Sequence, residues 1–358
     1  MIAIIGAGPA GNYLAYKLAQ EGKEVTIYEE HEVVGKPVQC TGIVTKAYDQ
    51  FGLPDDIILN ELQEVVIHAG KEKVSIPLNE HVLNRHYLDE TLGKMAVKEG
   101  ATLRTGYRYV GREGNVAIIQ TKEGIIRQPF QHLAGCDGPN SMVAQTSGLD
   151  KVKHYYIAAQ ATVKGNYDTK VFHTYFGDEA PKFFGWSVPE HPHYARVGIA
   201  TREKPGEHFK KLLNDTGTEE KNITDKQGGL IPIYNPRAKI MNDTTTLIGD
   251  AGGMIKATTG GGIITSMLQA NITAKKIMGQ PWKKEYRNLR LQLWIHYKIR
   301  NILDKFTTRD YEKLLLAMNT PKVKKILHEY PREYPSKFLY KLAIAQPRLA
   351  GLAILKGF

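Results

Sequence analysis

Three glycines near the start of the chain have the spacing of a turn that binds a dinucleotide. An apolar run over residues 1–5 leads into Gly6, Gly8 and Gly11, and a helical pattern follows. Gly6 permits a tight turn, Gly8 lets the backbone approach a diphosphate, and Gly11 lets the helix pack closely on the strand. Because the helix N-terminus favours negative charge, we expect Gly6, Gly8, Ala10 and Gly11 to bind that diphosphate.

A second apolar strand, residues 25–28, ends at Glu29, near the position of the acid that contacts an adenosine. Its carboxylate would accept both ribose hydroxyls and would repel a 2′-phosphate. Strand, turn, helix, strand and acid together predict a Rossmann-type unit that binds either NAD or FAD.

Two later turns also carry acids. Residues 135–138 follow an apolar strand and contain Asp137, which could organise a ligand site, cap the next helix, or do both. Residues 246–253 form another strand and turn with Asp250. A glycine-rich turn then leads into a helix, where Gly262 and Ile263 would present N–H donors and a positive dipole end.

These two turns resemble those of the flavoprotein family typified by p-hydroxybenzoate hydroxylase, which implies FAD as the cofactor. In that family the equivalent of Asp250 binds the ribityl or diphosphate part of FAD, and the helix after Gly262 faces the N1/C2=O edge of the flavin. An arginine in the position of Arg85 contacts the cofactor there, whereas a surface ion pair is the alternative role of a lone arginine. We also count Val110 among the candidate cofactor-binding residues.

The loop over residues 35–42 resembles that of geranylgeranyl reductases, which carries a cysteine followed closely by glycine near the flavin ring. The resemblance implies that Cys40, Thr41 and Gly42 contact the cofactor, and it makes Cys40 a candidate catalytic residue. The alternative is that Cys40, like Cys136, is an inert small hydrophobic side chain.

Residues 181–189 resemble the P-x-x-Y-x-W-x-F-P substrate motif of the same family, with Phe184 and Val188 at the positions of Tyr and Phe. This implies that Phe184, Trp186 and Pro189 line an apolar substrate tunnel. Aromatic residues at alternate strand positions are also what an ordinary buried sheet face contains, and that alternative stays open.

The resemblance implies a reductase that saturates double bonds of geranylgeranyl chains, in archaeal-type ether lipids or their prenyl precursors, by hydride transfer from N5 of the reduced flavin. The substrate would then be a polyprenyl lipid or a prenyl diphosphate. The sequence contains no second G-x-G-x-x-G unit for a nicotinamide nucleotide. The electron donor is therefore open between NAD(P)H, a ferredoxin and another carrier protein.

Two other functions are compatible with parts of the sequence. One is a flavin monooxygenase or halogenase of the same fold. Residues 184–189 partly resemble a W-x-W-x-I-P stretch of halogenases, which also use a lysine in the tunnel, and Lys71 or Lys73 lies in a region that could serve. An RNA-binding flavoprotein would explain the positive charge, but basic and aromatic residues are interleaved only in the helical stretch 294–300. We therefore expect no nucleic-acid partner.

The order of these patterns predicts an α/β fold: a Rossmann-like FAD-binding domain, an inserted antiparallel-sheet substrate domain and a helical C-terminal region. We expect the FAD-binding domain to be discontinuous, over residues 1–148 and 235–280. The inserted domain would span residues 149–234, and the helical region residues 281–358.

The amino-acid composition indicates which partners the protein favours and where in the cell it lies. The 358 residues include 48 Lys and Arg against 37 Asp and Glu, a net charge of +11 that favours anionic partners. Two cysteines cannot form a disulfide framework or a four-thiolate zinc site, which favours a reducing, cytoplasmic location. We see no signal peptide and no membrane span. The basic, apolar C-terminal helices could touch the inner face of a membrane, or they could simply pack on the core.

Overall fold

Two structural units share the chain in alternating segments. The computed structural model describes residues 1–357. Unit 1 comprises residues 1–38, 85–154 and 232–294, and unit 2 comprises residues 39–84, 155–231 and 295 onwards. Each unit has its own sheet and its own covering helices.

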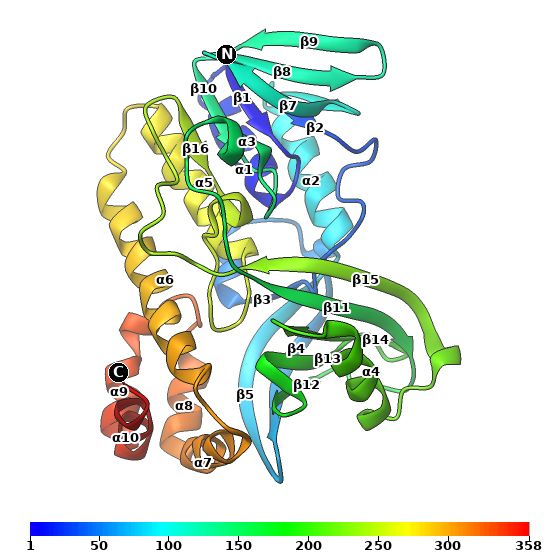
Figure 1. Cartoon of the computed structure of the whole chain (residues 1–358), viewed down its shortest axis with the longest axis vertical. Coiled ribbons are helices and arrows are strands. Elements are labelled where there is room, and N and C mark those ends of the chain that lie inside the picture. Colours follow the sequence, from blue (N-terminus) through cyan, green and yellow to red (C-terminus); the bar gives the residue numbers. More distant parts are fainter. Residues whose placement is uncertain (358) are drawn as a thin grey trace. The chain divides into compact units, whose positions relative to one another are not determined.

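A parallel five-stranded sheet forms the centre of unit 1 (Figure 1). Its strands in spatial order are β16 (Thr245–Leu247), β10 (His132–Gly135), β1 (Ile2–Ile5), β2 (Val25–Glu29) and β6 (Thr102–Thr105). Strands β1, β10 and β16 are buried along their whole length, as expected for parallel strands covered on both faces. Every pairing in this sheet is parallel.

Three helices of unit 1 follow the loops that contain candidate site residues. They are α1 (Pro9–Ala19), α2 (Arg85–Lys98) and α5 (Ile263–Ile277). Helix α1 packs against both α2 and α5. A short helix α3 (Met142–Thr146), a 3-10 turn η4 (Gly249–Gly252) and an antiparallel sheet complete the unit. That sheet consists of β7 (Arg108–Glu113), β8 (Val116–Thr121) and β9 (Gly124–Pro129).

An eight-stranded mixed sheet forms the centre of unit 2. Its strands in spatial order are β15 (Ile223–Pro232), β11 (Tyr155–Lys164), β14 (Tyr194–Thr201), β13 (Ala180–His191), β12 (Val171–Gly177), β4 (Ile58–Ala69), β5 (Glu72–Leu83) and β3 (Ile43–Thr45). Strands β12 and β4 pair in parallel, and the pairs β11–β14, β13–β14 and β12–β13 are antiparallel.

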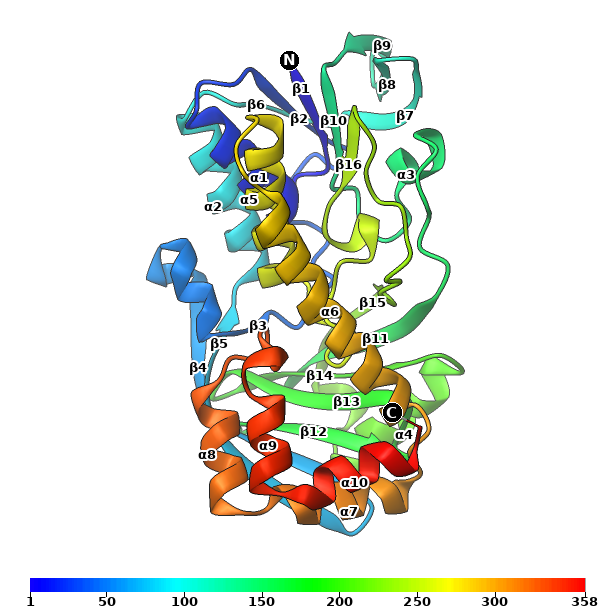
Figure 2. The same ribbon diagram turned by 90° about the vertical axis from the view of Figure 1, so that its left-hand side faces the viewer.

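Helix α4 (Pro205–Asp215) packs on β11 and β14, where Leu212 joins a buried cluster with Val163, Val197 and Ile199. Helices α7 (Thr308–Met318) and α8 (Pro321–Glu329) contact β5, as Figure 2 shows. The remaining elements of unit 2 are short: η1 (Lys46–Phe51), η2 (Asp55–Ile57), η3 (Glu220–Asn222), η5 (Pro335–Lys337), α9 (Leu339–Ala345) and α10 (Pro347–Leu355).

The predicted fold class is confirmed: a parallel α/β sheet, a second sheet rich in antiparallel pairs and a helical C-terminal part. The structure adds strands β3, β4 and β5 to the second sheet, although the prediction left residues 39–84 in the first domain. The long strand β5 alternates between exposed and buried side chains over part of its length. That pattern suits a sheet with one covered face.

Candidate functional site

The first glycine turn has the backbone that its sequence predicts. Gly6 has a positive φ of 97°, and a Cβ there would lie 2.4 Å from the carbonyl oxygen of Cys136. A Cβ at Gly11 would lie 2.0 Å from the oxygen of Gly6, so no larger residue fits either position. By contrast, a Cβ at Gly8 would meet no described atom within 4 Å. The space beside Gly8 is therefore open, while Gly6 and Gly11 are required by packing.

The N-terminus of α1 has no side-chain cap. Gly8 is its N-cap residue, Pro9 follows in the first turn, and the first turn contains no acidic residue. The first N–H groups of a helix lack partners within the helix, and their positive dipole end favours an anion. Together with the open space at Gly8, this arrangement fits a diphosphate.

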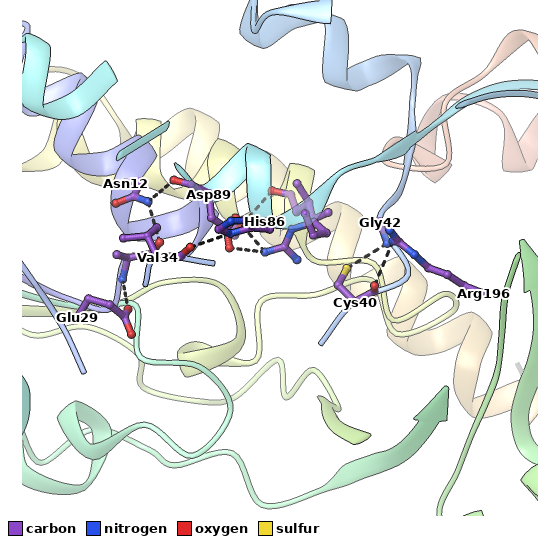
Figure 3. A network of polar contacts seen from close by, with 12 residues as sticks. Asn12, Glu29, Val34, Cys40, Gly42, His86, Asp89 and Arg196 are labelled. Atoms are coloured by element: carbon purple, nitrogen blue, oxygen red, sulfur yellow. Dashed lines mark hydrogen bonds and ion pairs between the residues drawn. The ribbon is translucent and has the colours of Figure 1, made fainter. Parts of the chain in front are cut away.

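Glu29 ends β2 beside this turn. Its Oε2 accepts a hydrogen bond from the backbone N–H of Ala7 at 2.8 Å (Figure 3). Its Oε1 accepts one from the N–H of His31 at 3.0 Å. The His31 ring nitrogen Nδ1 also lies 2.7 Å from Oε1. A carboxylate offers about four acceptor positions, so Glu29 keeps capacity for a further hydroxyl donor.

Two residues that we did not predict hold the turn against α2. The buried Asn12 donates from Nδ2 to the carbonyl oxygens of Ala7, at 2.7 Å, and Asp89, at 2.8 Å. Asp89 is 5% exposed, and its carboxylate receives both of its hydrogen bonds from Nη2 of Arg85, at 3.0 and 2.9 Å. Burial raises the pKa of Asp89, and the Arg85 charge opposes that shift. Arg85 therefore forms an ion pair inside the protein.

Asp137 supports the N-terminus of α3, whose N-cap residue is Ser141. Its Oδ1 accepts a hydrogen bond from the Ser141 hydroxyl at 2.7 Å, and its Oδ2 accepts one from the N–H of Val143 at 3.0 Å. Burial raises the pKa of Asp137, while these bonds lower it. Asp137 thus holds the N-cap residue and the first turn of α3 without being the N-cap itself, and each of its carboxylate oxygens accepts a hydrogen bond from this segment.

Asp250 differs from the other acids because its carboxylate receives no hydrogen bond from the described residues. Burial raises the pKa of Asp250 to about 6, and the positive charge of Arg85 counteracts the rise. Its Oδ1 would lie 3.0 Å from a Cβ at Gly262, the N-cap of α5, and the buried Ile263 opens that helix. Such a carboxylate needs a hydroxyl or N–H donor from a ligand to carry its charge at low cost.

The three turns of unit 1 converge. The turn at residues 135–138 abuts Gly6 through the Cys136 carbonyl. The turn at Gly249 abuts α1, because a Cβ at Gly249 would lie 3.7 Å from the Cβ of the buried Ala10. An uncapped helix, an open position at Gly8 and an unpartnered carboxylate at Asp250 therefore lie in the same unit, and they fit a bound dinucleotide such as FAD.

Val110 lies at an irregularity of β7, where the pairing with β8 shifts register between Tyr109 and Gly111. Its side chain is half-buried. Its role as a cofactor-binding residue stays a prediction.

In unit 2, the candidate residues around Cys40 form a short segment that we call the Cys40 turn (residues 39–42). The half-buried Cys40 accepts a hydrogen bond at Sγ from the N–H of Gly42 at 3.2 Å. Gly42 has a positive φ of 78°, and its carbonyl accepts a hydrogen bond from the N–H of Leu83 at 2.9 Å. Glycine at position 42 therefore allows the chain to turn into β3.

Two buried side chains of the eight-stranded sheet hold the Cys40 turn, and neither was predicted. Arg196 of β14 donates from Nη1 to the carbonyls of Cys40, at 3.3 Å, and Thr41 (Figure 3). Gln160 of β11 accepts the hydroxyl hydrogen bond of Thr41 at 2.8 Å. Both residues are polar interruptions of apolar strands, and that interruption is the signal by which the sequence could have indicated them.

The predicted substrate motif falls on β13. Phe184 and Trp186 are two residues apart, so they lie on one face of the strand, whereas the odd-numbered Pro189 belongs to the other face. The Phe184 ring is half-buried and lies 5.8 Å from the Trp186 ring, and Trp186 is 6% exposed. The structure thus joins two of the three predicted tunnel residues on one face.

Comparisons with known proteins agree with this geometry. The family described as "FAD binding domain" matches residues 1–280. Digeranylgeranylglycerophospholipid reductase 1 of Methanopyrus kandleri is 29% identical over 76% of this chain and 79% of its own length. The digeranylgeranylglycerophospholipid reductase of Methanocaldococcus jannaschii is 26% identical over 88% of this chain and 90% of its own length.

Solved structures show the same fold. A geranylgeranyl bacteriochlorophyll reductase-like protein of Thermoplasma acidophilum aligns with a TM-score of 0.80 and 21% identity, over 95% of this chain and 98% of its own. A flavin-dependent brominase aligns with a TM-score of 0.69 and 17% identity, over 91% of each chain. These comparisons confirm the resemblance to FAD flavoproteins that the sequence indicated, and the chain belongs to the FAD-binding domain family, with FAD as its cofactor.

Proposed function

We propose that this protein is an FAD-dependent reductase that saturates double bonds of geranylgeranyl chains, with an archaeal-type ether lipid or its prenyl precursor as substrate. The observation that carries the proposal is the hydrogen bonding between the Cys40 turn and the substrate strand β13. Thr41 and the indole N–H of Trp186 donate to the same oxygen of Gln160, each at 2.8 Å. The relatives named as digeranylgeranylglycerophospholipid reductases support the substrate class.

The residues of unit 1 have the task of binding the cofactor. The N-terminus of α1 at Gly8 would hold the diphosphate, Glu29 an adenosine ribose, and Asp250 a hydroxyl of the ribityl or diphosphate region. Gly262 and Ile263 open α5, whose positive dipole end would stabilise negative charge on the bound group. The Arg85–Asp89 pair would hold α2 beside these loops.

The residues of unit 2 have the task of binding the chain to be reduced. Reduced FAD supplies a hydride for one alkene carbon, and a proton must reach the other carbon from an acid. An isolated alkene polarises poorly, so the protein must hold it in position and keep water out. Phe184 and Trp186 would provide an apolar wall, and Cys40 is the candidate proton donor.

The direct test uses the purified protein loaded with FAD. The flavin is reduced with dithionite under anaerobic conditions, a geranylgeranyl lipid is added, and the products are analysed by mass spectrometry. Each double bond that is saturated adds about 2 Da to the lipid as the flavin reoxidises. A reduced flavin that no prenyl lipid or prenyl diphosphate reoxidises would contradict the proposal.

The fold alone also suits a halogenase or monooxygenase, since a brominase shares it. The two lysines considered for such a function do not favour it. Lys71 and Lys73 are both exposed; Lys71 lies in the turn between β4 and β5, and Lys73 is the second residue of β5, paired with His68. Substrate-dependent oxygen consumption in the same assay would identify an oxygen-using enzyme and exclude a simple reductase.

We further propose that α9 and α10 contact an anionic lipid surface. From residue 334 to the end, the chain contains four basic residues and no acidic one. Ile344, Ile354 and Leu355 are exposed in these helices, at 76%, 68% and 81%. None of the helices within residues 1–357 combines the length and hydropathy that a bilayer crossing requires. Exposed apolar side chains beside basic ones suit binding at the membrane surface.

The electron donor that reduces the flavin is proposed to be a diffusible partner, either NAD(P)H or an electron-carrier protein such as a ferredoxin. The sequence supports this because it contains one G-x-G-x-x-G unit, which the FAD site uses. Stopped-flow reduction of the flavin by NADH, NADPH and reduced ferredoxin would rank the three donors.

A further inference from the structure

Gln160 is a buried amide in an apolar strand, and all of its hydrogen-bonding groups near the site are in use. It is 5% exposed and belongs to β11. Its Oε1 accepts two hydrogen bonds, from the Thr41 hydroxyl and from the Trp186 indole, both at 2.8 Å. Its Nε2 donates to Oε1 of Gln227 at 3.2 Å. An amide oxygen has two lone pairs, so Oε1 is saturated by these two donors.

The Trp186 side chain has little freedom to adopt another position. Trp186 pairs with Gly198 on β14, and a Cβ at Gly198 would lie 2.6 Å from the indole ring. The ring therefore lies directly over the backbone of Gly198, where only glycine leaves room. Because the indole N–H also points to Gln160, both the plane and the rotation of the ring are determined.

Arg196 also holds the Cys40 turn, by hydrogen bonds to the backbone of that turn. Its guanidinium is 6% exposed, donates to the carbonyls of Cys40 and Thr41, and forms an ion pair with Glu190. The planar fork of an arginine binds two acceptors in a defined geometry, which a lysine cannot reproduce. The Cys40 turn is thus attached at a side chain by Gln160 and at two carbonyls by Arg196.

We propose that Gln160 and Arg196 are positioning residues that set the orientation of the Cys40 side chain relative to the Trp186 ring. This inference rests on the proposed function in one respect: the orientation would serve to place the Cys40 thiol and an aromatic wall against the same substrate. The hydrogen bonds themselves belong to unit 2 and do not depend on FAD or on a substrate.

The reactivity of the Cys40 thiol tests the proposal without any assay of reduction. The full-length protein is alkylated with iodoacetamide, and the rate at Cys40 is followed by peptide mass spectrometry. The second cysteine provides an internal reference, because burial raises the pKa of the Cys136 thiol well above its ordinary value and keeps it protonated.

The variants are Gln160→Met and Arg196→Met, with Gln227→Ala as the matched control. The control removes only the partner of Gln160 Nε2 and leaves the contacts to Thr41 and Trp186 intact. We expect the alkylation rate at Cys40 to change by about fivefold or more in the first two variants, a change typical of losing one hydrogen bond. The control should stay within about twofold of the wild type. Unchanged Cys40 rates in folded Gln160→Met and Arg196→Met variants would overturn the proposal.

If a buried substitution prevents folding, Thr41→Val and Trp186→Phe provide a second test. Each removes one donor to Gln160. Thr41→Val keeps nearly the same side-chain volume, whereas Trp186→Phe also replaces the indole with a smaller ring. Thr41→Val should change the alkylation rate at Cys40. Trp186→Phe should keep that rate at its wild-type value only if the ring at position 186 holds its place without the N–H hydrogen bond. Equal rates at Cys40 in wild type and Thr41→Val would also overturn the proposal.

A kinetic measurement connects the positioning role to the reaction. With a geranylgeranyl lipid, Gln160→Met should lower kcat by about tenfold with little change in KM, because the groups remain but their orientation is lost. If the wild type reduces no prenyl lipid, the proposed function fails, while the alkylation result stands by itself. If the wild type is active and Gln160→Met keeps its kcat, the positioning role fails alone.

Discussion

Oδ1 of Asp250 lies 3.0 Å from the point where a side chain would begin at Gly262. The acid that follows β16 and the N-cap residue of α5 thus face the same small space. A Cβ at position 262 would fill that space and crowd the carboxylate. Because no described residue hydrogen-bonds this carboxylate, a ligand with hydroxyl groups is its natural partner.

Asp250 should make FAD binding depend on pH. Burial raises the pKa of Asp250 from 3.8 to about 6. The protonated form of Asp250 therefore favours the folded apoprotein at low pH, and this stabilisation is lost as the pH rises through 6. Hydroxyl donors from FAD would stabilise the charged form, and binding would then release a proton. We expect FAD affinity to rise by up to about tenfold per pH unit below pH 6 and to level off above it.

Titration of the apoprotein with FAD, followed by flavin fluorescence, measures this dependence. Asp250→Asn should bind more weakly and show a flat profile, whereas the exposed Asp225→Asn should behave like the wild type. A wild-type affinity that does not change between about pH 5 and pH 7 would show that the carboxylate does not face the cofactor.

Gly8→Ala should lower FAD affinity without destabilising the apoprotein. Gly8 has ordinary backbone angles, with φ at −77°, and a Cβ there meets no described atom within 4 Å. The methyl group would instead occupy the proposed diphosphate position, and we expect a loss of at least about tenfold in affinity. Gly206→Ala in α4, which is equally free of contacts, is the control. Normal FAD binding by Gly8→Ala would place the diphosphate elsewhere.

The Arg85–Asp89 pair gives a test of whether Arg85 also serves the cofactor. Arg85→Met leaves the buried Asp89 carboxylate without its cation and should cost about 3 kcal/mol in the free energy of unfolding of the apoprotein. The double variant Arg85→Met/Asp89→Leu should recover most of that loss in urea denaturation. Its FAD affinity is measured at about pH 8, where Asp250 stays ionised without the Arg85 charge, so that the two effects are separated. Wild-type affinity then assigns Arg85 a purely structural role, and a weaker affinity assigns it a cofactor contact.

The C-terminal helices should bind anionic vesicles through their apolar side chains. Ile354→Ser/Leu355→Ser removes two highly exposed side chains of α10 and its end, so we expect at least about a tenfold loss of binding to phosphatidylglycerol vesicles. Ile125→Ser, at a 57% exposed position of β9, is the matched control. Flotation with phosphatidylcholine vesicles tests the charge dependence, and equal binding of all variants would argue against this contact surface.

The nucleotide-binding turn was predictable from sequence because its causes are local. Gly6 and Gly11 must be glycine for backbone packing, and both are needed within six residues of chain. The position of Glu29 was predictable too, because the length of the helix between the first two strands fixes where the second strand ends. The Arg85–Asp89 pair also has a local spacing, i and i+4, and it could have been predicted had we considered the helix face.

The attachments of the Cys40 turn were not predictable in the same way. Thr41 and Gln160 are 119 positions apart, and Arg196 is 156 positions from Cys40. A polar residue within an apolar strand indicates a buried partner, but the partner depends on how eight strands are ordered. That order includes β3–β5, whose membership of the second sheet is a property of the tertiary fold rather than of any motif.

The alternation of the two units along the chain limits how such a protein can be cut or recombined. The chain changes unit after residues 38, 84, 154, 231 and 294, and the last change falls inside the continuous helix α6 (Lys283–Leu303). Neither unit corresponds to one stretch of polypeptide. A truncation or a gene fusion at any point after residue 39 and before residue 294 would therefore divide both units, so neither unit can be removed or exchanged by a single cut there.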